Sequence, residues 1–196
     1  MQKQYIITED IFNKCKKFAE DSVKTSVDKY ARRNQFDVEK IIKDIRNGKI
    51  GEEGTYHSLL ECLPTLNPPD HQIYDKKQKS WDPDLKDASG IKVAVKSQDI
   101  DSAVNYGESW VFQIGNGKYD CDASVFKEID PNHYVAFNAL NVPKRRGTIK
   151  AIVKVQWLHE NNLFKPMKLR HLQNNKVAVY YSDLEQYTNQ LFQLPI

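Results

Sequence analysis

The sequence predicts an α/β or α+β fold in which helices come first along the chain and a sheet follows. Apolar residues recur at steps of three and four in the N-terminal part, which is typical of amphipathic helices. From Ile91 onward, several segments alternate with period two and are rich in β-branched and aromatic residues, which is typical of strands. This order of elements indicates a sheet covered by helices.

Three helices are expected before the sheet begins. Apolar side chains from Thr8 to Tyr30 lie on one face of a long helix. Asp37 can cap a second, short helix, which Asn47-Gly48 would end. The segment Gly51–Leu63 then predicts a third helix with a buried stripe of Tyr and Leu, ended by the prolines that follow.

The remaining segments predict mainly strands. In chain order, the extended segments are 71–75, 81–85, 91–96, 109–114, 133–140 and 148–158. A turn is expected at 115–117 and a last helix at 182–192. No internal repeat or low-complexity linker interrupts this order.

Length and composition favour one globular domain. The chain has 196 residues, of which 40% are hydrophobic and 28% are charged, so it has enough apolar surface for a core. Within this domain we expect an N-terminal helical part (1–47), a sheet core (48–160) and a basic, helical C-terminal part (161–196).

Several classes of protein are excluded by the sequence. No apolar run approaches the roughly 20 residues that cross a bilayer, and the N-terminus does not resemble a secretory signal. Cys15, Cys62 and Cys121 are too far apart for a disulfide framework or a CxxC metal clip. No phosphate-binding loop, HExxH or GxSxG motif is present. These features predict a cytoplasmic protein outside the membrane.

The charge is unevenly distributed along the chain. Residues 1–50 carry a formal charge of +4, residues 51–140 carry −7 and residues 141–196 carry +6, for a net charge of +3. This pattern fits either ordinary solvated faces or a polyanion held by the basic flanks. For a polyanion, the candidate phosphate contacts are Lys144, Arg145, Arg146, Lys165, Lys168 and Arg170.

The strand expected at 91–96 carries the residues with the most chemistry. Side chains alternate across a strand, so Ala94, Lys96 and Gln98 share one face. Pro83-Asp84 lies just upstream, at the expected end of a neighbouring strand, so Asp84 and Lys96 can lie side by side. In phosphodiester hydrolysis a carboxylate can hold Mg²⁺, while an ammonium orients or deprotonates the attacking water.

Pro83-Asp84, nine further residues and then Ala94-Val95-Lys96 resemble the signature of the PD-(D/E)XK nuclease superfamily, which includes type II restriction endonucleases. Glu52 and Glu53 open a segment similar to the acidic helix that often precedes that motif. The resemblance covers about residues 48–115. It implies a restriction-endonuclease-like mixed central β-sheet flanked by helices, and Mg²⁺-dependent DNA cleavage. It also implies a site of Asp84, Lys96 and one of the two glutamates, with the Val95 carbonyl as a metal ligand.

The chain departs from that family at position 94. The family has Glu, Asp or sometimes Gln where this chain has Ala94, the position that would share the metal with Asp84. An alanine side chain binds no metal ion, and one carboxylate alone holds Mg²⁺ weakly. Three explanations are open: a deliberate Glu-to-Ala change, an acid supplied by Glu52, Glu53 or Asp82, or a natural relative that does not cut. We favour the first, because alanine is small for this sheet face.

Each candidate residue also has a purely structural explanation. Asp84 can shape a turn after the preceding proline, and Lys96 can be a solvated edge residue. Glu52 and Glu53 can simply favour the start of a helix through its dipole. Gln98, a candidate DNA contact, is also an ordinary residue for a strand surface.

The sequence as a whole favours a Mg²⁺-dependent endonuclease that cuts double-stranded DNA at specific sequences. Cutting both strands would require a two-fold homodimer, for which the long N-terminal helix is a candidate face. One alternative is a DNA-binding module without catalysis on the same fold. The other is a repair or recombination nuclease that recognises DNA structure.

Overall fold

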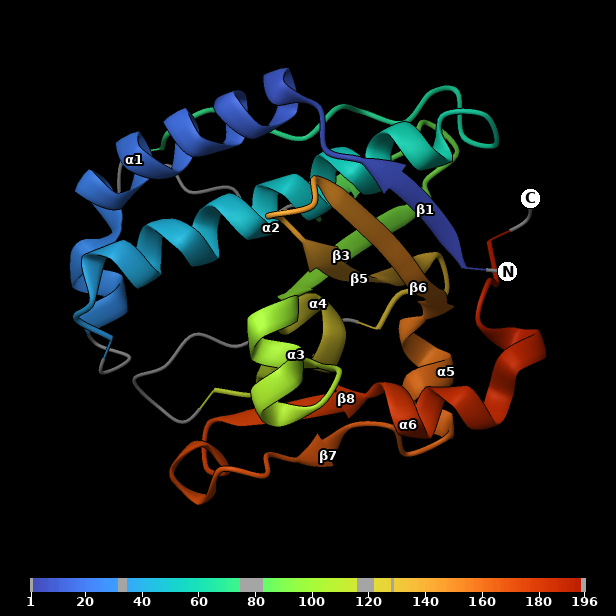
Figure 1. Ribbon diagram of the computed structural model, residues 1–196. Coiled ribbons are helices and arrows are strands. Elements are labelled where there is room, and N and C mark those ends of the chain that lie inside the picture. The colour runs from blue at the N-terminus through green and yellow to red at the C-terminus, as the bar shows by residue number, and fades with distance from the viewer. Residues whose placement is uncertain (1, 32–34, 75–82, 116–121, 128, 195–196) are drawn as a thin grey trace.

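The computed structural model describes residues 2–31, 35–74, 83–115, 122–127 and 129–194. The larger sheet of this part of the chain is mixed and has the order β1-β6-β5-β3-β2. Its strands, in that order, are Lys3–Ile6, Arg146–Lys154, His133–Asn141, Lys92–Asp99 and Leu85–Lys86. Strands β3 and β5 are parallel, and the other neighbours are antiparallel. This arrangement confirms the expected α+β class (Figure 1).

A smaller antiparallel sheet packs on one face of the larger sheet. It has the order β4-β8-β7, and its strands are Ser109–Gln113, Lys176–Tyr180 and Lys165–Pro166. Trp110 and Phe112 of β4 lie in one apolar cluster with Phe137 of β5 and Leu158. Both sheets therefore share a core, and the face of β3 that carries Lys96 is covered.

Helices cover the opposite face of the larger sheet. α1 (Glu9–Ala31) packs against α2 (Val38–Leu59), and α2 lies directly on the sheet (Figure 1). The shorter helices are α3 (Ile100–Tyr106), α4 (Ala123–Phe126), α5 (Val155–Glu160) and α6 (Tyr181–Leu184), with 3-10 turns at Arg170–Leu172 and Glu185–Gln190. Under α2, Leu59, Val93 and Ile152 belong to a second apolar cluster. The expected helix from Thr8 to Tyr30 is confirmed by α1.

The two helices expected at 38–47 and 51–63 are one continuous helix, α2, so the expected break at Asn47-Gly48 is wrong. Asp37 does cap this helix, since its side chain accepts a hydrogen bond from Lys40 N–H at 3.0 Å. Both halves bury one stripe against the sheet and α1. That packing outweighs the penalty of about 1 kcal/mol for glycine inside a helix.

Four further expectations differ from the structure. The segment 148–158 is a strand only to Lys154 and then turns into α5. Residues 71–74 form no strand, and residue 75 lies outside the described residues. The last helix is short and continues as a 3-10 turn. The sequence did not indicate β1, whose residues are mostly exposed and pair with β6.

Two other expectations concern the cysteines and the membrane. Cys15 and Cys62 are free thiols, and Cys121 lies outside the described residues. None of the helices formed by the described residues has the length and apolar character that a bilayer crossing requires.

Candidate functional site

Asp84 lies directly before β2 and beside the middle of β3. The register pairs Leu85 with Val93, so Asp84 falls opposite Ala94. Val95 N–H donates a hydrogen bond to Asp84 Oδ2 at 2.7 Å. The neighbouring strands therefore bring Asp84 to the strand that carries Lys96.

The carbonyl of Val95 points to the same side as Asp84. In a strand, the N–H and C=O of one residue face the same neighbour, and Val95 N–H faces Asp84. The register would place Pro83 opposite Val95, and proline has no N–H to donate. The Val95 carbonyl oxygen therefore points to the side on which Asp84 lies, and residue 83 supplies no backbone N–H to bond it.

Glu52 brings a second carboxylate to this place from α2. Its side chain is almost completely buried, and Lys49 Nζ lies 2.6 Å from its Oε2. The pKa of Glu52 is raised to about 8, first by burial and then by the charge of Asp84, against the lowering effect of Lys49. Glu52 and Asp84 are thus neighbours whose negative charges oppose each other.

The pKa of Asp84 is also raised from its ordinary value. Its side chain touches solvent, yet the surrounding protein withdraws the carboxylate from bulk water. That effect outweighs the Val95 hydrogen bond and the charges of Lys96 and Lys49, which lower the pKa. A cation bound between Asp84 and Glu52 would stabilise the negative charge of both carboxylates.

Lys96 projects from the face of β3 that packs on the smaller sheet, opposite the face covered by α2. It has a fixed partner there. Its Nζ lies 3.1 Å from Asp122 Oδ2 and 4.8 Å from the centre of the Phe112 ring. Asp122 is itself held by Gln113, whose N–H donates to Asp122 Oδ2 at 2.8 Å. Lys96 is therefore held by an ion pair, and its side chain is only 23% exposed, which does not fit a freely solvated residue.

Asp122 was missed by sequence reasoning. It belongs to no motif and lies 26 positions after Lys96 along the chain. Its charge raises the pKa of Asp84, so it lies near both candidate catalytic residues. Lys49 was missed in the same way, since only the position of α2 brings it to Glu52.

Glu53 has a different environment from Glu52. Lys14 Nζ and His71 Nε2 lie 2.6 Å and 2.7 Å from its Oε1, and His57 Nε2 lies 3.6 Å from Oε2. Burial alone would raise the pKa of Glu53, but the hydrogen bonds from His71 and Lys14 outweigh it and lower the pKa to about 2. The charge of Asp84 is among the main causes that raise the pKa of Glu52, whereas His71 and Lys14 dominate at Glu53. Asp82, the third candidate acid, lies outside the described residues.

Ala94 lies between Lys92 and Lys96 on one face of β3. Its methyl group packs against the cluster that contains Phe112 and Phe137. The side chain is only half-buried, so this position retains some space toward solvent. The site as it stands therefore has Asp84, Glu52 and the Val95 carbonyl as oxygen donors.

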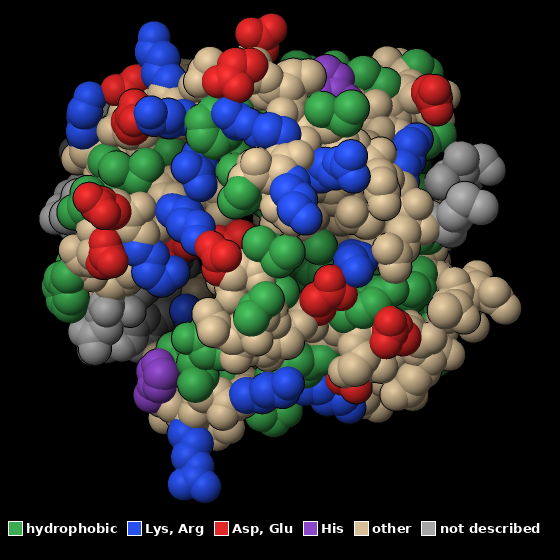
Figure 2. All heavy atoms as spheres, viewed as in Figure 1, with side chains coloured by type: hydrophobic (Ala, Val, Ile, Leu, Met, Phe, Trp, Pro, Cys, Tyr) green, Lys and Arg blue, Asp and Glu red, His purple; other side chains and the backbone are tan. Residues whose placement is uncertain are grey.

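The candidate DNA contacts lie in three places. Lys144 and Arg145 lie in the turn between β5 and β6, and Arg146 begins β6. Lys165, Lys168 and Arg170 are exposed on and after β7, on the smaller sheet. In Figure 2, Lys and Arg side chains lie over the helical layer at the top and over β7 and β8 at the bottom, mixed with acidic side chains.

Two of these candidates have structural partners. Gln98 Oε1 accepts a hydrogen bond from Ser109 N–H at 2.9 Å, and its Nε2 donates to Gly107 O at 3.0 Å. These bonds tie the loop after α3 to β3. Arg145 Nη2 bonds Glu9 Oε2 at 2.9 Å, and its guanidinium stacks on Phe12.

The donor chemistry at Asp84 fits a hard divalent cation. Mg²⁺ prefers oxygen ligands, uses one or two carboxylates and keeps several waters. Asp84, Glu52 and the Val95 carbonyl provide such a set, although the described residues contain no group of three or more Asp, Glu, His or Cys side chains arranged to hold a metal ion. No family model matches this chain, and no curated protein matches it either.

Proposed function

We propose that this chain is a Mg²⁺-dependent DNA endonuclease of the PD-(D/E)XK type with a restriction-endonuclease-like fold. The observation that carries the proposal is the position of Asp84 beside the strand that bears Lys96, with the buried carboxylate of Glu52 close to it. Two carboxylates with raised pKa values, next to a lysine, are typical of a catalytic site.

The residues have distinct roles in this proposal. Asp84, Glu52 and the Val95 carbonyl would hold Mg²⁺, which supplies charge stabilisation for the phosphoryl oxygens. Lys96, held by Asp122, orients the attacking water and offsets negative charge in the transition state. Water oxygen bonds to phosphorus as the bond from phosphorus to the 3′ oxygen breaks, which leaves a 5′-phosphate.

The second explanation of Ala94, an acid supplied from elsewhere, gains support from Glu52. Glu52 is buried and its pKa is raised by the charge of Asp84, whereas a residue that only favours a helix terminus needs no burial. A deliberate Glu-to-Ala change remains compatible with the same contacts. Under it, a glutamate at position 94 would lie between Lys92 and Lys96, each about 7 Å away along the strand.

The test is a cleavage assay on mixed-sequence duplex DNA with Mg²⁺. We expect Ala94→Glu to raise the cleavage rate at least ~100-fold, because it adds a carboxylate beside Asp84. In that background, Glu52→Gln or Lys96→Ala should lower the rate by a further ~10-fold or more. Glu61→Gln, which removes an exposed glutamate just after α2, is the matched control and should have no effect.

Each outcome decides between the explanations. If the unchanged chain already cuts and Glu52→Gln abolishes cutting, Glu52 completes the site. If only Ala94→Glu cuts, the chain is a disabled nuclease. If neither cuts and neither binds DNA, the proposal is wrong.

A second candidate function is a DNA-binding module that does not cut. It is favoured by the fit of the Ala94 methyl group against Phe112 and Phe137, which needs no larger side chain. Salt-sensitive DNA binding without cleavage by either chain would establish it. Competition between branched and linear duplexes would identify the structure-specific alternative.

The partners and location are part of the same proposal. We propose double-stranded DNA as the substrate, a homodimer as the active form and the cytoplasm as the location. The apolar stripe of α1, with Cys15 and Ala19, packs within the same chain. A dimer through α1 would therefore use its outer, polar face.

A further inference from the structure

A second group of charged residues lies at the other end of β3 from Asp84, around a cavity of about 440 Å³. α1, α2, the start of α3 and the turn between β5 and β6 all contribute to its wall. Asp99, which lines it, follows Ala94 by five positions on β3, or roughly 17 Å at the rise of a strand. The cavity is therefore separate from the Asp84 site.

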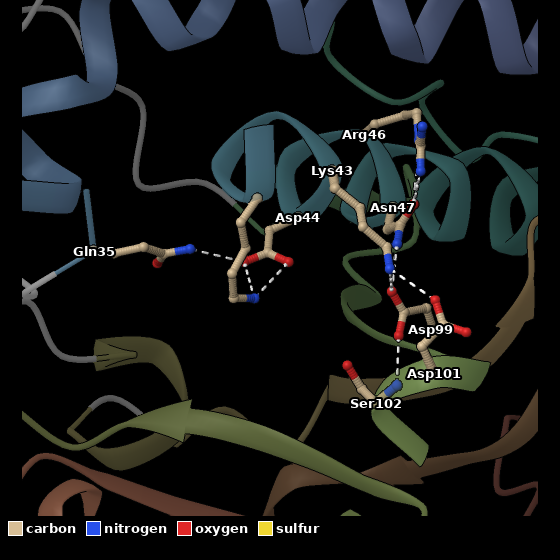
Figure 3. Close-up of polar contacts among 9 residues, drawn as sticks. Gln35, Lys43, Asp44, Arg46, Asn47, Asp99, Asp101 and Ser102 are labelled. Carbon is tan, nitrogen blue, oxygen red and sulfur yellow. Dashed lines mark hydrogen bonds and ion pairs between the residues drawn. The ribbon is translucent and has the colours of Figure 1, made fainter. Parts of the chain in front are cut away.

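The carboxylates beside this cavity already have a partner. Lys43 Nζ lies 2.8 Å from Asp99 Oδ2 and 3.0 Å from Asp101 Oδ2. Figure 3 shows Lys43 reaching from α2 between the two aspartates. Both acids bond to Lys43, so neither is bonded to Arg46, although the charge of Asp99 still acts on Arg46.

Arg46 has no carboxylate bonded to it among the described residues. Its Nε and Nη2 donate to Asn47 Oδ1 at 3.3 Å and 3.1 Å, and that amide is neutral (Figure 3). Burial and the like charge of Arg145 lower the pKa of Arg46. The guanidinium carbons of Arg46 and Arg145 lie 5.2 Å and 3.6 Å from the centre of the Phe12 ring. The positive charges of both arginines thus lie against the same aromatic ring.

Arg145 is held in an unusual conformation at the same place. Its φ is 52°, in the left-handed region that arginine rarely adopts. Its Nη1 is buried with no hydrogen-bond partner in the described part of the chain. Its one carboxylate partner, Glu9, has a side chain that is 68% exposed and is easily replaced by another anion. Backbone strain and an unpaired buried donor in one residue are typical of a binding site.

We propose that this cavity binds a phosphate group between Arg46 and Arg145. Each guanidinium presents a planar fork of donors, and a phosphate has enough oxygens to accept from both forks at once. A carboxylate, with two oxygens, satisfies only one fork. The apolar side chains of Val142 and Pro143 line the same cavity and limit the water that competes for these bonds.

The phosphate has two sources. One is the backbone of a bound DNA, in which case the inference rests on the proposed nuclease function. The other is a free phosphate or phosphomonoester, in which case the site is independent of DNA. The chemistry of recognition is the same, so the experiment separates them.

The test is isothermal titration of the full chain with inorganic phosphate at constant ionic strength. We expect a dissociation constant on the order of 1 mM, weakened at least ~10-fold by Arg46→Gln or Arg145→Gln, since each removes charge-assisted hydrogen bonds. Arg145→Lys keeps the charge but lacks the planar fork of donors. Its dissociation constant should lie between those of the unchanged chain and Arg145→Gln. Lys16→Gln removes one exposed charge from α1 and should leave binding unchanged.

The remaining measurements identify the source of the phosphate and exclude misfolding as the cause of lost binding. Circular dichroism and urea unfolding establish that each variant is folded. If phosphate displaces a short duplex and Arg46→Gln weakens duplex binding, the ligand is a DNA phosphate; if duplex binding is unaffected, it is a free phosphate. Absence of phosphate binding, or equal loss in Lys16→Gln, would overturn the inference. Phosphate binding, with neither DNA cleavage nor DNA binding by the unchanged chain or by Ala94→Glu, would instead count against the nuclease proposal alone.

Discussion

At the scale of single residues, Glu52 shows how its surroundings change the pKa of a side chain. The adjacent Glu53 has three basic partners and a pKa lowered to about 2, whereas Glu52 has one partner, Lys49, and faces the like charge of Asp84. The same residue type at neighbouring positions therefore differs by several units in pKa. Only Glu52 is poised to gain from a bound cation.

This difference predicts a pH dependence of stability. The pKa of Glu52 is about 8 in the folded chain and near 4.5 when unfolded. Between these values the folded chain retains a proton that the unfolded chain has lost, so stability falls as pH rises from about 5 to 8. Urea unfolding should show a loss of about 4 kcal/mol over this range that Glu52→Gln removes. An identical pH profile for the variant would contradict the raised pKa.

A second residue-scale feature is the buried amide of Asn138, which joins three elements. Asn138 Oδ1 accepts from Tyr5 Oη of β1 at 3.0 Å, and Asn138 Nδ2 donates to Thr55 Oγ1 of α2 at 3.0 Å. Its backbone carbonyl accepts from Trp110 Nε1 of β4 at 2.9 Å. One side chain thus satisfies polar groups that would be costly to bury alone.

At the scale of elements, α2 positions the site because it lies unusually close to the sheet. A Cβ on Gly51 would come within 1.8 Å of Ser97 Oγ on β3, and one on Gly54 within 2.1 Å of the Tyr5 ring. A Cβ on Gly48 would meet nothing within 4 Å. Gly51 and Gly54, and not the expected helix breaker Gly48, therefore allow the close approach of α2 to the sheet.

Gly51 and Gly48 provide a matched pair of substitutions. Gly51→Ala should destabilise the fold by about 2 kcal/mol, because α2 or Ser97 must shift to admit the methyl group. Gly48→Ala should stabilise it by up to about 1 kcal/mol through helix propensity alone. Denaturant unfolding measures both free energies. A stabilising Gly51→Ala would show that α2 does not pack as closely as described.

At the scale of the whole molecule, positive charge lies at two ends of the fold. The helical layer and the smaller sheet both present basic side chains, mixed with acidic ones (Figure 2), and the acidic middle segment of the sequence includes Asp84 and Asp99. In the proposed nuclease, such an arrangement attracts a polyanion to the edges and leaves the cation site between them.

The smaller sheet should then contribute to the salt dependence of DNA binding. Replacing Lys165, Lys168 and Arg170 together by Ala removes three exposed charges. We expect the slope of log K against log salt to fall by about 2 to 3, since each phosphate contact contributes about 0.9. Fluorescence anisotropy between 50 and 200 mM salt measures it. An unchanged slope would place the DNA elsewhere, for example on α1.

The local patterns of the sequence were sufficient for a large part of this description. The period of α1, the cap at Asp37 and the alternation of β3 were all predicted, because each depends on neighbours within a few positions. The sequence analysis also expected the segment at Asp84 to neighbour the strand that carries Lys96, and β2 does pair with β3. The α+β class follows from the same patterns.

What the tertiary structure decided was everything that depends on distant partners. The continuity of α2, the covering of the Lys96 face, the pairing of Lys96 with Asp122 and the choice of Glu52 over Glu53 have no local signal. A helix passes through a glycine, or a carboxylate becomes buried, only because a surface far along the chain packs against it. Sequence periodicity therefore determined which segments are helices and strands, and long-range packing determined which charged groups meet.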